Sequence, residues 1–350
     1  MTVILFLIVL AILIFVHELG HFLVARACGI RVDEFALGFG PKLWSTQRGE
    51  TKYALNLIPF GGYVKIFGEN PDTNSISGPD SSRSFVNKPK WQQTLVLVAG
   101  VTFNFIFAWI LVSIAFMSGV PASTESYPQY ADRMSESRIT ITYVEPKSPA
   151  DIAGLKAGDK ITGYSTVEEI QTAINASSDK GILLNEKNII AKEGIVEGKY
   201  AIGISMDKVA TLRLPIHLAV FEGAKFTIHI MKLVTVGIYD LIAGIFTGES
   251  KLSSVTGPIG IAGLVSDAAH LGFTYLMMFT ALISINLGIL NLVPFPALDG
   301  GRILFVFIEA IIRRPIKPAI ANTFNAIGFA LLITLMLVVT YKDIVKMFVK

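Results

Sequence analysis

Residues 3–24, VILFLIVLAILIFVHELGHFLV, decide the fold of this chain, because they form one apolar run that contains His17, Glu18 and His21. A hydrocarbon core about 30 Å thick requires about 20 helical residues to cross it. Ionisable side chains are costly at that depth and usually mark a site of function. The stretch therefore predicts a membrane helix that carries out chemistry.

The composition indicates a protein that crosses a membrane several times. Of its 350 residues, 52% are hydrophobic and only 16% are charged, and the mean hydropathy is +0.58. The net charge of +3 is small and no basic tract is interleaved with aromatic residues, which argues against nucleic-acid binding. The single cysteine, Cys28, excludes an intramolecular disulfide, and we interpret it as a small residue at the membrane interface.

The first segment also has one feature of a secretory signal peptide, since Ala25-Arg26-Ala27 has the form of a cleavage site. However, no Lys or Arg precedes the apolar run, whereas Arg26 and Arg31 follow it. Positive charges mark the cytoplasmic end of a span. We therefore predict an uncleaved helix with its N-terminus outside.

Further apolar runs predict further spans. The stretch 226–246 is nearly apolar enough to cross, but His229, Lys232 and Asp240 interrupt it at spacings that suit a helix lying along the membrane surface. Three other runs are long enough to cross, namely 94–118, 272–293 and 322–341.

The segment between the first two spans, residues 26–90, carries nine Lys or Arg, as expected of a cytoplasmic loop. Its segments 33–44 and 52–67 are rich in β-branched and aromatic residues and predict short strands. Parts of both segments are too apolar for an ordinary solvated loop. We therefore expect a membrane-associated β-loop over residues 30–70.

Residues 120–215 predict one extracytoplasmic α+β domain. Its opening, Ile139–Ile161, resembles the PDZ domains of bacterial envelope proteases, which bind an extended peptide along a strand. A generic small α+β domain remains the alternative. The predicted division of the chain is a membrane part over 1–119, the PDZ-like domain over 120–215, a surface helix and linker over 216–271, and a second membrane part over 272–350.

The pair His17 and His21 is suited to binding one Zn²⁺, because residues four apart on a helix project from one face. Glu18 then lies beside the metal, where it can take a proton from the attacking water and deliver it to the leaving amine. The alternative is that these residues merely pair within a helix bundle. The cost of burying them in lipid argues against that alternative.

A catalytic zinc site needs a third protein ligand, and Asp299 is the candidate. It is the only acidic residue between Leu271 and Phe307, whereas the remaining histidines are predicted to lie outside the cytoplasmic half. Pro294 and Pro296 break the preceding helix, and such a break is tolerated in a membrane only beside protein or a wet cavity. A broken helix of this kind can direct Asp299 at a metal.

Depth in the membrane links the zinc ligands to the topology. At about 1.5 Å per residue, His17 lies in the cytoplasmic half of its span. Asp299 reaches the same half only if residues 226–246 do not cross the membrane. We therefore predict a polytopic α-helical membrane protein with four transmembrane helices, a membrane-associated β-loop and one extracytoplasmic PDZ-like α+β domain.

These features resemble the site-2 protease family, peptidase family M50, in its bacterial sigma-E-regulating branch and in a form with a single PDZ domain. The resemblance covers most of the chain. It is carried by HELGH at 17–21, GFGP at 38–41, PFGGYV at 59–64, the single PDZ-like domain, GPIGIA at 257–262 and NLVPFPALDGG at 291–301.

The resemblance implies an intramembrane zinc metalloprotease with Zn²⁺ held by His17, His21 and Asp299, and with Glu18 as the general base. It also implies that Asn291 contacts the substrate backbone and that the β-loop holds the substrate extended. Residues expected to bind substrate are Asn291, Gly38, Phe39, Gly61, Gly62 and Tyr63. Relatives often have Ala-Gly-Pro before an asparagine in the second span, whereas here Ala99-Gly100-Val101 precedes Asn104, whose role stays open.

The implied partners are the lipid bilayer, single-span membrane substrates such as an anti-sigma factor or signal-peptide remnants, and a peptide ligand of the PDZ domain. The implied location is the bacterial inner membrane, with the active site toward the cytoplasm and the PDZ domain in the periplasm. Two other functions are weighed. A metal transporter would need polar residues spread over several spans, and a scaffold with a structural zinc would have no use for Glu18.

Overall fold

The computed structural model describes residues 2–70, 72–177, 181–185, 187–196, 199–248, 256–314 and 316–348. The chain divides into two compact units. The first comprises Met1–Ala115 and Val220–Lys350, and the second comprises Phe116–Ala219.

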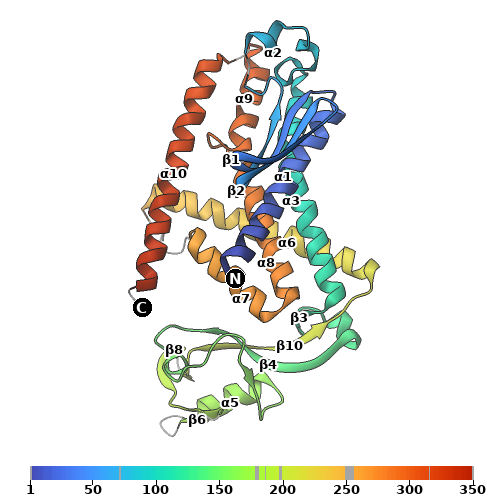
Figure 1. Cartoon of the computed structure of the whole chain (residues 1–350). Helices are drawn as coiled ribbons and strands as arrows, with labels where there is room; N and C mark the ends of the chain where they lie inside the picture. The colour runs from blue at the N-terminus through green and yellow to red at the C-terminus, as the bar shows by residue number, and fades with distance from the viewer. Residues whose placement is uncertain are drawn as a thin grey trace. The chain divides into compact units, whose positions relative to one another are not determined.

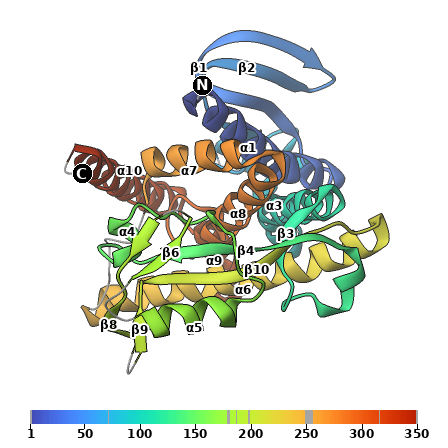
Figure 2. The ribbon, with the colours of Figure 1, turned by 90° about the horizontal axis from the view of Figure 1, so that it is seen from below.

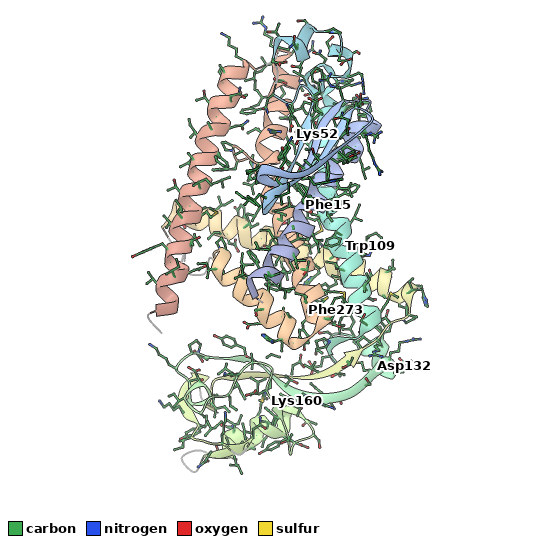
Figure 3. The ribbon with its side chains drawn as sticks, viewed as in Figure 1. Phe15, Lys52, Trp109, Asp132, Lys160 and Phe273 are labelled. Carbon is green, nitrogen blue, oxygen red and sulfur yellow. The ribbon has the colours of Figure 1, made fainter. Side chains whose placement is uncertain are left out.

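The first unit is built on long apolar helices. Among the described residues, five helices are long and apolar enough to cross a membrane, namely α1, α3, α6, α8 and α10. Exposed aromatic side chains such as Phe15, Trp109 and Phe273 cover the outer faces of three of them (Figure 3), as expected of surfaces that meet lipid. The helices of this unit are α1 (Thr2–Ala27), α2 (Thr73–Ser77), α3 (Lys90–Ser118), α6 (Ile216–Thr247), α7 (Pro258–Leu271), α8 (Phe273–Leu292), α9 (Asp299–Ile312) and α10 (Pro318–Phe348), with short 3₁₀ turns at Ser81–Arg83 and Phe85–Asn87.

Helix α6 differs from its sequence-based description. The surface helix predicted over 226–246 is longer, and its length and composition also fit a span, although its mean hydropathy of 1.5 is the lowest of the five. Within this unit α1 and α8 run in one direction and α3 and α10 in the other, whereas α6 lies across them (Figures 1 and 2).

A long antiparallel hairpin packs against α1. It consists of β1 (Val32–Arg48) and β2 (Thr51–Ile66), in place of the shorter strands predicted over 33–44 and 52–67. The hairpin curls, because Glu34 lies opposite both Lys52 and Lys65, so the first part of β1 pairs with both ends of β2. The last part of β2 is thereby brought to the edge of the curled sheet, next to α1.

A buried hydrophobic cluster of the first unit surrounds the start of β1 and the end of β2. Phe22 from α1, Phe35 from β1 and Val96 from α3 are buried in one cluster with Val306 from α9. Phe22 and Phe35 meet edge to face with ring centroids 5.3 Å apart. The cluster joins α1 and β1, which are consecutive in the sequence, to α3 and to the distant α9.

The second unit is a small α+β fold with a four-stranded sheet in the order β3-β10-β4-β5. Ile141 and Ile170 are fully buried in its core, between the sheet and α5. Its elements are β3 (Val120–Ser123), a 3₁₀ segment (Pro128–Arg133), β4 (Met134–Val144), α4 (Pro149–Ile152), β5 (Lys160–Ile161), α5 (Val167–Ser177), β6 (Ile182–Leu184), β7 (Lys187–Ile189), β8 (Lys192–Val196), β9 (Lys199–Ala201) and β10 (Ile204–Leu212).

Candidate metal centre

Two histidines and one aspartate converge inside the first unit. His17 Nε2 lies 3.1 Å and His21 Nε2 3.3 Å from Asp299 Oδ2, and the two Nε2 atoms are 3.2 Å apart. Both imidazoles are buried. The structure therefore brings together the three residues that the sequence nominated as metal ligands, across 282 residues of chain.

The spacing of these three atoms fits a zinc ion. Bonds of about 2.0 Å in tetrahedral geometry place ligand atoms about 3.3 Å apart. The three measured separations of 3.1, 3.2 and 3.3 Å agree with that value. Two imidazole nitrogens and one carboxylate oxygen are also a donor set typical of catalytic zinc.

Asp299 is placed by a break in the membrane helix. Helix α8 ends at Leu292, and α9 begins at Asp299 itself. In the intervening segment Ala297 has a φ of 72°, and its N–H donates to Asn325 Oδ1 at 3.3 Å, which helps to satisfy the freed backbone. A side chain at Gly300 would overlap the carbonyl oxygens at the end of α8, so glycine is required there for the chain to turn back.

Groups on α3 contact the Nδ1 atoms of the two imidazoles, on the side away from Asp299. His21 Nδ1 donates to the carbonyl oxygen of Val96 at 2.8 Å, so that in the neutral imidazole Nε2 carries no proton and is directed at the centre. Asn104 Nδ2 lies 3.1 Å from His17 Nδ1, and Asn104 Oδ1 is buried without a hydrogen-bond partner among the described residues. If Nε2 binds a metal, Nδ1 carries the proton, and turning the Asn104 amide by 180° presents Oδ1 as the acceptor that this proton requires.

The close approach of α3 to α1 depends on two glycines. A Cβ at Gly20 would lie 2.5 Å from the carbonyl oxygen of Ala99, and a Cβ at Gly100 would overlap the His21 ring. Sequence reasoning left the role of Asn104 open, named Gly100 only as part of the motif before it, and did not consider Val96. Their spacing of four residues on one helix is the signal that would have revealed a shared face.

Glu18 faces a small pocket next to the three ligands. The pocket has a volume of about 190 Å³. The backbone N–H of Val64, on β2, faces the Glu18 carboxylate. The pocket is lined by His17, Glu18, His21, Tyr63, Val64, Ile66, Glu69, Asp299 and Arg302. Space for a reacting group therefore exists beside both the ligand atoms and a carboxylate.

The residues expected to bind substrate lie at different distances from this pocket. Tyr63 lines it, and a Cβ at Gly62 would lie 3.7 Å from Glu18 Cγ, so β2 passes close to that side chain. The ring of Phe39 stacks on Tyr63 with centroids 6.0 Å apart, and Gly61 packs beneath it. Gly38, with a φ of 79°, allows a close approach of β1 to β2. Asn291 lies in the last turn of α8 and is not among the described residues that line the pocket.

Tyr63 is anchored at its far end. Its hydroxyl donates to Glu34 Oε1 at 3.2 Å. Burial, together with the negative charge of Glu34, raises the pKa of the Tyr63 phenol, so the hydroxyl stays protonated at neutral pH. The side chain therefore holds one position at the mouth of the pocket.

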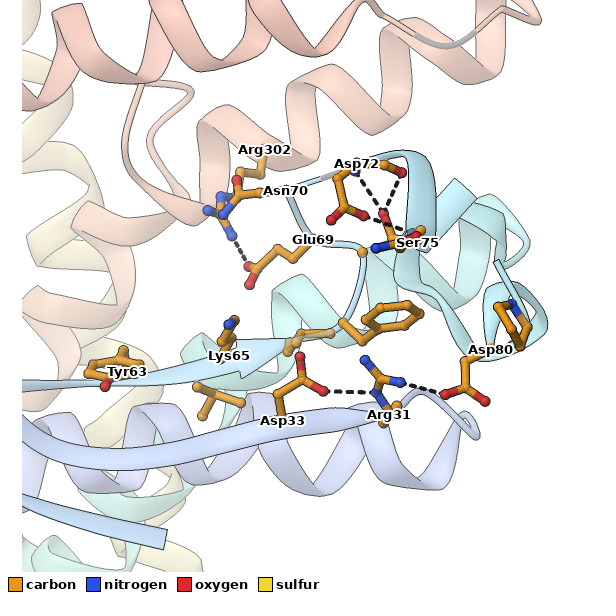
Figure 4. A pocket seen from close by; sticks show the side chains of 16 residues that line it. Arg31, Asp33, Tyr63, Lys65, Glu69, Asn70, Asp72, Ser75, Asp80 and Arg302 are labelled. Carbon is orange, nitrogen blue, oxygen red and sulfur yellow. Dashed lines mark hydrogen bonds and ion pairs between the residues drawn. The ribbon is translucent and has the colours of Figure 1, made fainter. Parts of the chain in front are cut away.

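A larger polar cavity adjoins the small pocket (Figure 4). Its volume is about 790 Å³, and Tyr63, Val64, Ile66, Glu69 and Arg302 line both. Elsewhere in the cavity, Arg31 pairs with Asp33 at 2.8 Å and with Asp80 at 2.5 Å. Sequence reasoning predicted neither the large cavity nor the ion pair between Glu69 and Arg302. Both depend on how the loop after β2 packs against α9.

Comparisons with known proteins agree on one family. The sequence profile described as Peptidase family M50 matches residues 5–335. A Clostridium perfringens protein whose name marks it as an inferred zinc metalloprotease is 35% identical, with 95% of each chain covered. A Staphylococcus aureus protein with a name of the same kind is 31% identical over 99% of each chain. The regulator of sigma-W protease RasP of Bacillus subtilis is also 31% identical over 99% of each chain.

Proposed function

This chain belongs to peptidase family M50, and we propose that it hydrolyses peptide bonds within the transmembrane segments of single-span membrane proteins. The predicted resemblance to this family is thereby confirmed, and the chain is a zinc metalloprotease. The observation that carries the proposal is the tetrahedral spacing of His17, His21 and Asp299, two of which come from an apolar helix of membrane-spanning length.

Each residue of the centre has a role in this proposal. His17, His21 and Asp299 hold zinc, which supplies Lewis acidity to the carbonyl group and lowers the pKa of water when it is bound. Glu18 takes a proton from the attacking water and delivers it to the nitrogen of the leaving amine. Asn104 and Val96 keep the two imidazoles in the orientation that binds metal.

The hairpin has a role in holding the substrate. A peptide bond within a helix is shielded because its N–H and C=O are already paired, so the substrate must unwind before water can attack. The end of β2, residues 62–66, runs past Glu18 and offers a strand edge for the released backbone groups. Gly38, Phe39, Gly61, Gly62 and Tyr63 shape that edge, and Asn291 contacts the substrate from α8.

The proposed topology has four spans, with α6 along the membrane surface. The crosswise course of α6 and the alternating directions of α1, α3, α8 and α10 support it (Figure 1). The meeting of His17 with Asp299 also supports it, because a fifth crossing would carry Asp299 to the opposite side. We place the active site in the cytoplasmic half of a bacterial cytoplasmic membrane.

The proposed substrates are anti-sigma factors, in keeping with the sigma-W regulation in the name of the Bacillus relative, or signal-peptide remnants. The second unit is proposed to be a single extracytoplasmic PDZ domain. A groove of about 660 Å³ between α5 and the start of β10 supports peptide binding there. A closed structural zinc site is disfavoured because Glu18 and open space adjoin the ligands.

The test uses purified full-length protein and a synthetic single-span substrate in detergent or liposomes. We expect about one zinc per chain in the wild type, and Glu18→Gln should keep the zinc while it loses cleavage. Asp299→Asn should lose zinc as well as cleavage. Glu125→Gln, at an exposed position of the second unit outside the α5–β10 groove, is a matched control that should retain both. Cleavage by Glu18→Gln at the wild-type rate would overturn the proposed mechanism.

A further inference from the structure

Arg302 lies beside the metal centre, where the proposed mechanism gives it no role. It follows Asp299 by one helical turn on α9. Among the described residues that line the zinc pocket, it is the one with a permanent positive charge. Its side chain is 31% exposed, although it lies deep in the unit, because it faces the adjoining polar cavity.

Glu69 holds the guanidinium between the two cavities. The two side chains form an ion pair and face each other in Figure 4, and both line the small pocket as well as the large one. A guanidinium has five N–H donors, and one carboxylate engages at most two of them. Glu69 is the ion-pair partner that the described residues provide, so Arg302 retains donors for a second acceptor.

The pocket lining carries three carboxylates, those of Glu18, Glu69 and Asp299, so Arg302 is the group of that lining whose permanent charge matches an anion. Peptide hydrolysis adds water across the bond, so the C–N bond breaks and the two products carry a new carboxylate and a new amine. The carboxylate forms at the carbonyl carbon, beside the zinc ligands and therefore beside Arg302. Guanidinium groups match carboxylates in geometry and bind them with charge-assisted hydrogen bonds.

We propose that Arg302 binds the carboxylate created by hydrolysis, and that the large polar cavity is the route by which the fragment carrying it leaves. This inference rests on the proposed function. A volume of about 790 Å³ lies within the range of cavities that accept small-molecule ligands, and so has room for the carboxylate end of the fragment. Arg302 stands at the boundary between the two cavities, so it contacts the fragment as it passes from one to the other.

The test compares two forms of one product peptide. The carboxylate-bearing fragment of the synthetic substrate is identified by mass spectrometry, synthesised with either a free carboxylate or a carboxamide end, and titrated against full-length zinc-loaded protein. Wild type should bind the carboxylate at least about tenfold more tightly than the amide, as one charge-assisted hydrogen bond requires. Arg302→Gln should remove most of that preference, and Arg302→Lys should keep part of it.

Two further variants separate binding from a merely structural ion pair. Arg48→Gln alters an exposed arginine of β1 that lines neither cavity, and should leave the preference unchanged. Glu69→Gln frees the guanidinium and should tighten carboxylate binding, whereas a structural pair predicts weaker binding or none. An unchanged carboxylate preference in Arg302→Gln, or weaker carboxylate binding in Glu69→Gln, would overturn the inference. Absence of cleavage by wild type would instead refute the proposed function.

Discussion

Gly100 gives the sharpest test of how the two imidazoles are held. A methyl group at this position would lie 2.8 Å from His21 Cε1 and 2.9 Å from His17 Cε1, and would overlap His21 Nε2. Real carbon atoms do not approach so closely, and the backbone of α3 is fixed by its packing on α1. The rings must therefore move away from the position in which both Nε2 atoms face Asp299.

The size of the effect follows from two opposing terms. Replacing glycine by alanine in a helix gains about 1 kcal/mol of helix propensity. Overpacking a buried contact costs about 1–3 kcal/mol. Gly100→Ala should therefore destabilise the fold by at most about 2 kcal/mol, whereas displaced ligands should lower zinc affinity about 10–100-fold.

The assay is a competition between the protein and a chelator of known zinc affinity, with the thermal midpoint measured in parallel. Gly263→Ala in α7 is the matched control, because a Cβ there has no neighbour within 4 Å, and it should raise the midpoint and leave zinc binding unchanged. Wild-type zinc affinity in Gly100→Ala would refute the argument that α3 presses on the rings.

Three other substitutions probe separate parts of the account. Asn104→Leu removes the group facing His17 Nδ1 and should weaken zinc binding about 10–100-fold in the same chelator assay; an unchanged affinity would remove Asn104 from the site. Gly62→Val places a branched side chain against Glu18, so cleavage should fall at least tenfold while zinc content stays at one per chain, and loss of zinc would show that the damage is structural instead. Asp343→Ala removes the carboxylate that accepts from the Gly260 N–H at 2.9 Å near the start of α7; it should destabilise the chain by about 1 kcal/mol in thermal unfolding, and an unchanged midpoint would contradict the capping role.

The parts of the site that depend on residues close together in the chain could be predicted from the sequence. His17 and His21 share a helix face, and the helix period alone places them together. Asp299 could be identified by elimination, because the apolar span before it contains no other acidic residue. The side chains of these residues face one another in the structure as predicted, although their binding of zinc stays a prediction.

The remaining parts of the site depend on how distant elements cross. Asn104 and Gly100 contact the histidines only because α3 packs against α1. An asparagine or a glycine in an apolar helix does not by itself predict such a contact. Arg302 lies beside the three candidate metal ligands and pairs with Glu69, which is more than 200 residues earlier in the sequence. That pairing depends on the packing of the loop after β2 against α9. Asn291 was expected near the metal, but it lies in the last turn of α8, outside the lining of the zinc pocket.

The number of membrane spans could not be predicted from hydropathy alone. Hydropathy measures whether a helix is able to cross a membrane, and α6 satisfies that measure as α8 does. The spacing of Lys232 and Asp240 indicates a surface helix, and the proposed count of four spans rests on the meeting of His17 with Asp299. In this proposal the metal ligands constrain the topology where hydropathy does not.

The central claim is that His17, His21 and Asp299 bind one zinc ion, and zinc K-edge X-ray absorption of the purified full-length protein tests it most directly. The account predicts a shell of nitrogen and oxygen ligands at about 2.0–2.1 Å with the multiple scattering of two imidazoles. In Asp299→Asn, and in a variant with either histidine replaced by alanine, the bound zinc should be lost. A sulfur ligand in that spectrum, or full zinc content after replacement of His17 and His21, would contradict it.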